Sequence, residues 1–402
     1  METRPAAAVT TSRRKVLELW LYPLLAVTLV IGWQTATVHV NYGGNWTALF
    51  CIGSRFPVPP QLTHEHAYVF PDSPGFDGQF YHLIAHDPVF SQGFSRYIDA
   101  PEYRYRRILV PALAFLFAGG DSRRVDWAYL VVCWMFIAMG TSWACRFAHM
   151  HQRPLWLGLL FLCLPAVLAS IDRLVVDVAL SALTVGFALY AARGPSWELY
   201  LILAVAALSR ETGFLLLGGY GVSSALRGRW GAVLRCAVAA LPALGWYGFV
   251  HANAEAFHPT EILAVVPFRH LIDAVMHPAI PSSANTLVRW LAGAAEALVL
   301  AGTLGSMMIT AAWVIRRKHS PSAMIAAVFV LLCLLLGTSG PSDLFAHVFN
   351  YARIFTPLYL LLALQAVASG RVLFALPLAC VAPRAAMQFG MQVLAIGQRL
   401  LG

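Results

Sequence analysis

The chain has 402 residues, of which 59% are hydrophobic and only 12% are charged, and its mean hydropathy is +0.67. A soluble domain carries about 25% charged residues, so this chain cannot coat a water-exposed surface, and a disordered, collagen-like or disulfide-stapled protein is excluded. The net charge of +9 would suggest nucleic acid for a soluble protein, but the basic residues lie mostly in short runs between apolar stretches. Such runs are typical topology signals, so we expect an all-α polytopic membrane protein with no nucleic-acid partner.

The first apolar segment follows Arg13, Arg14 and Lys15. It extends over about 22 residues to Val38, which is long enough to span a membrane and too long for a secretory signal. We therefore expect an uncleaved first span that begins in the cytoplasm. Residues 39–107 then form a polar loop rich in Pro, Gly, His, Asp and Tyr, and this loop faces outward by the positive-inside rule.

The next apolar stretch, from Ile108 to Ala118, decides the side on which every later loop lies. Its eleven residues are short for a span and suit a helix along the membrane surface. If it does not cross, the basic clusters at Arg146–Arg153, Arg193, Arg227/Arg229/Arg235 and Arg316/Arg317/Lys318 all lie inside. If it does cross, Arg146, Arg153 and Arg193 move outside, and Arg123 and Arg124 move inside. The first alternative agrees better with the positive-inside rule.

On that topology the chain has about eleven spans. We expect them at 16–38, 127–148, 154–170, 174–192, 197–208, 212–226, 231–250, 287–315, 321–338, 353–369 and 372–394. The segments 197–208 and 212–226 are short, and one long interrupted helix is the alternative for them. The chain then divides into a seven-span unit, 1–250, with the outer loop 39–126, and a second unit, 251–402, with the outer loop 251–286.

Ionisable groups at membrane depth are costly and are therefore functional candidates. On the predicted topology they converge on the outer face. They are Asp77 with Gln79 and Tyr81, the run Tyr103-Arg104-Tyr105-Arg106-Arg107, Asp172 with Arg173 and Asp177, Arg210 with Glu211, and Asp343, His347, Asn350, Tyr351 and Arg353.

Each of these groups has a functional and a structural interpretation. Asp77 is either a general base or the N-cap of a helix over 79–86. The arginines of the Tyr-Arg run bind either a specific phosphate or anionic lipid headgroups. The charges at 172–177 and 210–211 either hold an anionic ligand or form an ion-pair network between helices.

Metal binding has little support in the sequence. Asp77 with Asp172 or Asp177 offers carboxylates to a divalent cation such as Mg²⁺ or Mn²⁺. The seven cysteines form no Cys-x-x-Cys pair, and the thirteen histidines are interpreted as scattered. We therefore expect neither a zinc site nor a disulfide framework.

Three motifs, taken in order, resemble GT-C fold glycosyltransferases. Residues 76–85, Phe-Asp-Gly-Gln-Phe-Tyr-His-Leu-Ile-Ala, resemble the Asp-Gly-x-x-Tyr-x-x-Ile-Ala segment of this family. The likeness is greatest to its GPI-mannosyltransferase-like branch and to related bacterial proteins of cell-surface glycopolymer formation. Residues 103–111 match the Tyr-Arg-Tyr-x-Arg-Ile-Leu-x-Pro run of the bacterial group, and residues 209–212 match a later Ser/Thr-Arg-Glu-Thr motif.

The resemblance implies a seven-span module with the catalytic aspartate in its first outer loop. By this likeness Asp77 is the base that deprotonates an acceptor hydroxyl, and the donor is a polyprenyl-phosphate sugar. The glycan or lipid acceptor would be glycosylated with inversion at the periplasmic face of the bacterial inner membrane. The residues expected to bind substrate are Gln79, Tyr81, Arg104, Arg106, Arg107, Asp172, Arg173, Asp177, Arg210, Glu211, His347, Tyr351 and Arg353. The paired acidic motif of several GT-C members is absent, which leaves metal dependence open.

Two other classes of protein fit the same residues. In a lipid-linked saccharide transporter the arginines would bind pyrophosphate, and Asp77 would only cap a helix. A noncatalytic protein of cell-envelope assembly is the third interpretation.

Overall fold

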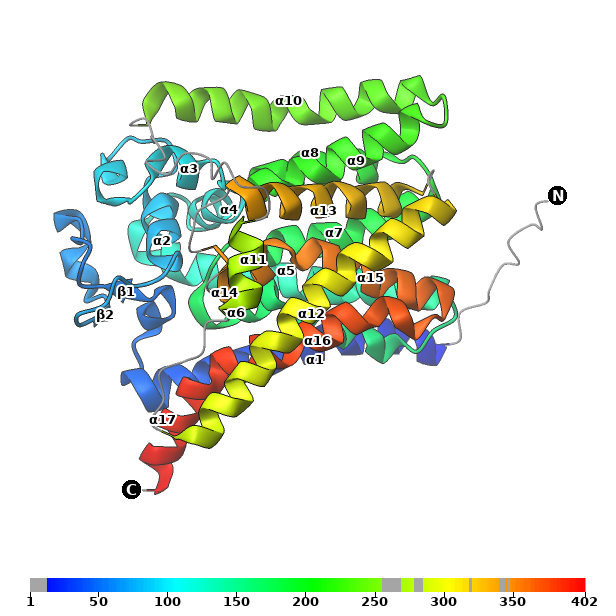
Figure 1. The fold of residues 1–402 in the computed structure, drawn as a ribbon. Coiled ribbons are helices and arrows are strands. Elements are labelled where there is room, and N and C mark those ends of the chain that lie inside the picture. Colours follow the sequence, from blue (N-terminus) through cyan, green and yellow to red (C-terminus); the bar gives the residue numbers. More distant parts are fainter. Residues whose placement is uncertain are drawn as a thin grey trace.

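The computed structural model describes residues 13–254, 269–277, 285–317, 320–339, 344–345 and 348–401. Nearly all of this part of the chain is helical, as the composition predicts, and the helices pack side by side into a bundle (Figure 1). The first half contains α1 (Arg13–Tyr42), α2 (Gly78–His86), α3 (Pro101–Tyr105), α4 (Leu109–Phe117), α5 (Ser122–Met150), α6 (Pro165–Arg173), α7 (Asp177–Arg193), α8 (Trp197–Ser209), α9 (Phe214–Ala225) and α10 (Trp230–Asn253). The second half contains α11 (Arg269–Met276), α12 (Thr286–Arg317), α13 (Pro321–Ser339), α14 (Val348–Ile354), α15 (Thr356–Ser369), α16 (Leu376–Ala386) and α17 (Gly390–Leu401).

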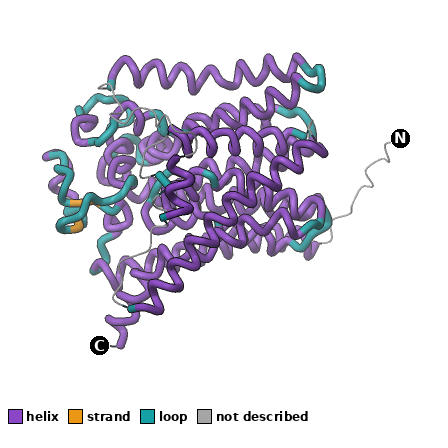
Figure 2. The backbone as a smooth tube through the Cα atoms, viewed as in Figure 1, coloured by secondary structure: helices purple, strands orange, loops and turns teal. Residues whose placement is uncertain are grey.

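The polar loop after α1 folds into a small cap on one end of the bundle, drawn in blue and cyan in Figure 1. Besides α2 and α3 it holds the 3₁₀ helices η1 (Trp46–Phe50), η2 (Pro60–Glu65) and η3 (Phe94–Tyr97). Its two strands, β1 (Ile52–Gly53) and β2 (Val69–Phe70), pair in parallel and are the short orange segments of Figure 2. The cap therefore carries α2, with Asp77 at its start, beside the ends of the long helices.

Five helical segments are long and apolar enough to cross a membrane, and a bent pair brings the number to six. The five are Leu17–Tyr42, Ser122–Met150, Trp230–Asn253, Thr286–Arg316 and Val372–Arg399. Three shorter apolar helices, α8, α13 and α15, lie within segments expected to span. The nine residues of α4 rise only about 14 Å, less than half of the bilayer core, so this helix does not reach across it.

The segment expected to span at 154–170 is not one straight helix. A 3₁₀ helix, η4 (Leu155–Cys163), precedes α6, and the two are bent by 63° at their junction. Pro165 begins α6 at this bend, and proline lacks the N–H group that a continuous helix would need there.

The chain turns back between the two short segments that follow α7. The 3₁₀ helix η5 (Glu211–Gly213) separates α8 from α9. A Cβ atom on Gly213 would lie 2.1 Å from the carbonyl oxygen of Ala206, seven residues earlier, whereas a straight helix would separate these positions by about 10 Å. The single interrupted helix is therefore wrong, and Arg210 and Glu211 lie at a tight turn.

Helix α7 is the innermost helix, because every residue from Asp177 to Leu189 is buried. It packs against α5, α8 and α15. The loops that join α5 to η4, α7 to α8 and α9 to α10 lie at the end of the bundle opposite the cap, as does the C-terminal end of α12 (Figure 1). The N-terminus of α7, with Asp177, thus lies at the same end as the cap.

Candidate active site at the cap

Asp77 immediately precedes α2, but within the described part of the chain its side chain makes no capping hydrogen bond to that helix. Its carboxylate instead contacts two arginines from distant segments. Arg104 Nη1 lies 2.9 Å from Oδ1, and Arg353 Nη2 lies 2.5 Å from Oδ2. The capping interpretation of Asp77 is therefore wrong, and the carboxylate lies between two guanidinium groups.

Gly78 explains why a glycine follows this aspartate. A Cβ atom at position 78 would lie 2.3 Å from the carbonyl oxygen of Arg173 and 2.9 Å from that of Phe50. The first turn of α2 thus packs directly on the backbone at the end of α6 and of η1. The glycine fixes the place of Asp77 through this close approach.

The charges around Asp77 set its protonation state. Burial alone would raise the pKa of the Asp77 carboxyl, but the guanidinium groups of Arg104, Arg353 and Arg107 outweigh burial and hold the pKa far below its usual range. Asp77 is therefore ionised at neutral pH, and while both arginines contact it, it is a weak base.

Eight side chains form a continuous chain of alternating charge, which we call the acid–arginine network. Its members in order are Asp99, Arg104, Asp77, Arg353, Asp177, Arg210, Glu211 and Arg107. Four carboxylates (−4) face four guanidinium groups (+4), so the network is formally neutral. The members come from the cap, from α7, from the turn after α8 and from α14, and the tertiary fold alone brings them together.

The inner half of the network is buried. The side chains of Arg210 and Asp177, which form an ion pair, are 2% and 3% exposed. Arg353 Nε lies 3.6 Å from the second oxygen of Asp177, and Arg210 Nε lies 3.7 Å from Glu211 Oε1. Burial and the nearby charge of Arg107 lower the pKa of Arg210 to about 10, so it remains protonated at neutral pH.

Arg107 is held by two tyrosines and by Glu211. Its Nη1 donates a hydrogen bond of 2.8 Å to Tyr81 Oη, and its guanidinium lies 4.1 Å from the centre of the Tyr103 ring. Glu211 accepts from Arg107 at 2.6 and 2.8 Å. Burial would raise the pKa of Glu211, but Arg107 and Arg210 outweigh it and lower that pKa to about 2. Tyr81 and Glu211 therefore orient the arginine.

Other expected site residues lie beside the network rather than in it. Gln79 braces the cap, because its Oε1 accepts from Gly53 N at 3.0 Å and its Nε2 donates to Pro74 O at 2.8 Å. Arg106 pairs with Glu102 on α3. Tyr351 is buried, and its ring stacks on Phe345.

Asp172 and Arg173 form a second charged pair, beside Phe76. Asp172 contacts Arg173 Nε at 3.4 Å and Gln388 Nε2 at 3.3 Å. The guanidinium groups of Arg173 and Arg353 lie 4.4 and 5.3 Å from the Phe76 ring centre. Asp172, Arg173 and Phe76 line a cavity of about 200 Å³ whose other walls include Tyr42, Phe70 and Gln388. This cavity adjoins the Asp77 site across the Phe76 ring.

His347 and Asp343 lie outside the described residues, so their relation to Asp77 stays a prediction. Asp99 was not expected in the site. The only signal for it in the sequence is its position five residues before Arg104, in a loop that the fold brings back toward Arg104.

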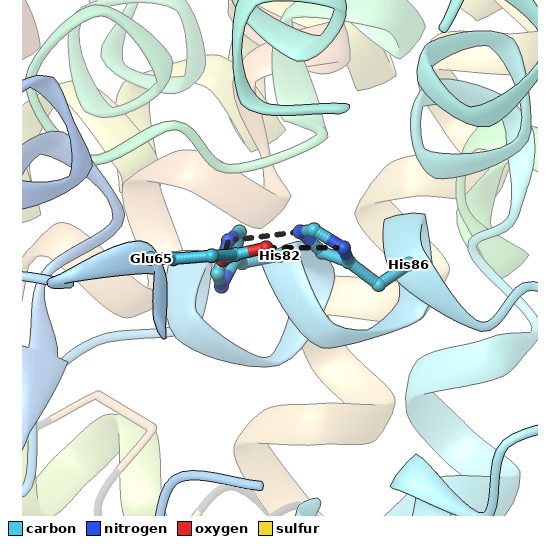
Figure 3. A group of neighbouring side chains, drawn as sticks. All are labelled: Glu65, His82 and His86. Carbon is cyan, nitrogen blue, oxygen red and sulfur yellow. Dashed lines mark hydrogen bonds and ion pairs between the residues drawn. The ribbon is translucent and has the colours of Figure 1, made fainter. Parts of the chain in front are cut away.

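A metal held by Asp77 with Asp172 or Asp177 also stays a prediction, although the Asp77 and Asp177 carboxylates face guanidinium groups. A group with metal-ligand spacing occurs elsewhere in the described residues, at Glu65, His82 and His86 (Figure 3). The interpretation of all the histidines as scattered is therefore wrong for His82 and His86. Their spacing of four residues, which places both side chains on one face of a helix, was the signal for this pair.

Comparison with known proteins adds no relative to this geometry. No family model matches the chain, and neither the curated proteins nor the solved structures give a match. The likeness to GT-C fold glycosyltransferases therefore rests on the three sequence motifs alone.

Proposed function

We propose that the protein is an inverting glycosyltransferase that moves a sugar from a polyprenyl-phosphate donor to a glycan or lipid acceptor. The observation that carries the proposal is the position of Asp77: its carboxylate does not cap α2 and lies between Arg104 and Arg353. Transfer from a phosphate-linked sugar requires a base for the acceptor hydroxyl and guanidinium groups for the phosphate, and the site holds both side by side. The residues concerned, apart from Arg353, belong to the motifs that resemble GT-C enzymes.

The arginines would bind the donor phosphate. Guanidinium groups present a planar fork of donors that matches phosphate oxygens. Because the acid–arginine network is formally neutral without a donor, the phosphate adds negative charge and competes with Asp77 for Arg104 and Arg353. A carboxylate that loses these contacts binds a proton more readily, because the positive charges no longer favour its ionised form. Donor binding would thus convert Asp77 from a weak base into one that can accept a proton from the acceptor hydroxyl.

The reaction would proceed in a single displacement. The acceptor oxygen forms a bond to the anomeric carbon while the bond from that carbon to the phosphate oxygen breaks. The hydroxyl proton passes to Asp77, and polyprenyl phosphate leaves with its charge stabilised by the arginines. Attack opposite the phosphate inverts the anomeric centre. The arginines supply the counter-charge, so no divalent cation is needed at Asp77.

We place this site at the outer face of the bacterial inner membrane, in a chain of about eleven spans. Nucleotide sugars are not available there, so a lipid-linked donor is required. The distribution of basic loops supports this orientation. The C-terminal ends of α7, α9 and α12 lie at the end of the bundle opposite the cap, where the positive-inside rule places cytoplasmic loops (Figure 1). In the sequence, Arg193, Arg227 and Arg316 belong to or closely follow these helix ends. The seven spans to residue 250 would form the catalytic module, and 251–402 would shape the acceptor and donor sites.

The test compares two aspartates that contact the same arginine. Asp77→Asn and Asp99→Asn each remove one carboxylate from Arg104, but only Asp77 is the proposed base. With purified protein and a synthetic polyprenyl-phosphate sugar, we expect Asp77→Asn to reduce kcat by about 10²- to 10⁴-fold, the usual contribution of a general base. Asp99→Asn should retain most of the transfer. Equal transfer by wild type and Asp77→Asn would refute the catalytic role.

The same purified protein also tests the transporter interpretation. Reconstituted wild-type protein that moves a labelled lipid-linked saccharide across liposomes without transferring sugar would overturn the proposed function. Transfer to an added acceptor, with inversion measured by NMR of the product, is the expected result.

A further inference from the structure

Glu65, His82 and His86 bring their ligand atoms together in the cap (Figure 3). The two histidines lie one turn apart on α2, and Glu65 is the last residue of η2. Each residue offers one ligand atom, and these three atoms all lie within 4.8 Å of one another. A fourth side chain, Asp126 of α5, joins them through contacts to both imidazoles.

Three distances among His82, His86 and Asp126 are close to the edge length of a metal coordination tetrahedron. His82 Nε2 lies 3.2 Å from His86 Nε2 and 2.8 Å from Asp126 Oδ1, and His86 Nε2 lies 3.6 Å from the same Asp126 oxygen. Ligands bound at 2.0–2.1 Å to a tetrahedral zinc ion lie about 3.3 Å apart. Glu65 Oε2 lies 3.8 Å from His82 Nε2. A short movement of the Glu65 side chain would therefore bring this oxygen into the fourth ligand position.

The surroundings orient the His86 imidazole for metal binding. His86 Nδ1 and the Ser122 hydroxyl lie 2.7 Å apart, and a ring nitrogen that donates to such a partner leaves Nε2 as the free lone pair. That lone pair faces the Nε2 atom of His82. Two facing imidazole nitrogens require either a shared proton or a bound cation between them.

Because the cluster is buried, bulk water cannot serve as the partner that the two facing imidazole nitrogens require. The side chains of His82, His86 and Glu65 are only 2%, 1% and 9% exposed, while Asp126 is 22% exposed. Within the described part of the chain, Glu65 Oε2 is buried and makes no hydrogen bond. Buried polar groups in native proteins are paired or coordinate metals. Two carboxylates and two neutral imidazoles would exactly balance the two charges of a divalent ion.

We propose that Glu65, His82, His86 and Asp126 form a structural zinc site. Two imidazole nitrogens and two carboxylate oxygens form a ligand set that suits four-coordinate zinc. Mg²⁺ instead prefers six oxygen ligands. The ion would tie η2 and α5 to α2, the helix that begins directly after Asp77. The site positions this helix and takes no part in the chemistry, so the proposal is independent of the proposed function.

Zinc content is the direct test. Full-length protein in detergent is incubated with ZnCl₂, desalted and measured by mass spectrometry, and we expect about one zinc ion per chain, as for a closed four-ligand site. The double variant His82→Ala/His86→Ala should lose nearly all of this zinc. His39→Ala, which removes an exposed histidine of α1, should keep it. Wild type without bound zinc, or a double variant that retains the wild-type amount, would overturn the proposal.

Two further measurements separate ligand loss from misfolding. Glu65→Gln and Asp126→Asn preserve side-chain shape, and each should weaken zinc retention in protein that remains monodisperse. In wild type stripped with EDTA, ZnCl₂ should raise Tm because a ligand that binds the native state stabilises it, and MgCl₂ at the same concentration should not. An unchanged Tm with zinc, or an equal rise with magnesium, would contradict a zinc site.

Discussion

The Arg353 guanidinium lies 2.5 Å from the Asp77 carboxylate, although 276 residues separate them in the chain. This contact joins the cap, in the first half of the chain, to α14 in the second half. Both of the predicted units, 1–250 and 251–402, therefore contribute to the Asp77 site. Removing one member leaves the other with its second partner, Arg104 for Asp77 or Asp177 for Arg353, so the cost should be below the value of about 3–5 kcal/mol for breaking an isolated buried pair.

The stability of the cap should depend on pH through Asp77. A carboxyl whose pKa is lowered on folding stabilises the protein above its unfolded-state pKa, and this stabilisation is lost as pH falls toward the folded-state value. We expect Asp77→Asn to have a lower Tm than wild type, by a constant difference from pH 8 to 5. The difference should shrink below about pH 4, where the carboxyl of the unfolded chain becomes protonated. Calorimetry in detergent measures this, and a difference that grows in acid would contradict the ion pairing.

Arg353 should matter for binding of the phosphate donor. A hydrogen bond to a charged group contributes about 1.5–3 kcal/mol, so Arg353→Ala should raise KM for a polyprenyl-phosphate sugar by about 10- to 100-fold. Arg371→Ala is the matched control, because Arg371 is exposed and lies outside the cap. Steady-state kinetics distinguish the two variants. Equal KM values for Arg353→Ala and Arg371→Ala would remove Arg353 from the donor site.

Gly78→Ala should disturb the cap although alanine is the better helix former. The added Cβ would lie 2.3 Å from the backbone carbonyl oxygen of Arg173, so α2 or α6 must shift. We expect a lower Tm and reduced transfer activity. Gly32→Ala is the control, because open space surrounds a Cβ there and the change should stabilise α1 by up to about 1 kcal/mol. If both variants melt at the wild-type temperature, the close packing at Gly78 is refuted.

The orientation in the membrane can be tested with single cysteines. In a background where all seven native cysteines are replaced by serine, Ser54→Cys lies in the cap and Pro195→Cys lies in the loop between α7 and α8. A membrane-impermeant maleimide added to intact spheroplasts should label position 54 and spare position 195. After lysis both should react. Labelling of position 195 from outside would reverse the proposed sidedness.

Much of the fold follows from the sequence, because an apolar run of about 20 residues satisfies all its backbone hydrogen bonds within itself when it forms a membrane-spanning helix. The helices of the structure coincide with most of the expected segments, and α4 is short, as its apolar stretch predicts. One feature differs from the expected segments, and a second decides between two alternatives that the sequence left open. The bend between η4 and α6 depends on Pro165, and the reversal after α8 depends on the close approach of Gly213 to Ala206.

The sequence by itself determined the class of protein, the places of the helices and the residue types of the site. It could not decide whether Asp77 capped α2 or faced arginines, because both arrangements follow the same Asp-Gly turn. Only the tertiary structure placed Arg104 and Arg353 on that carboxylate and Asp126 beside His82 and His86. These contacts link segments far apart in the chain, and their geometry is set by how the helices pack, which local sequence patterns do not encode.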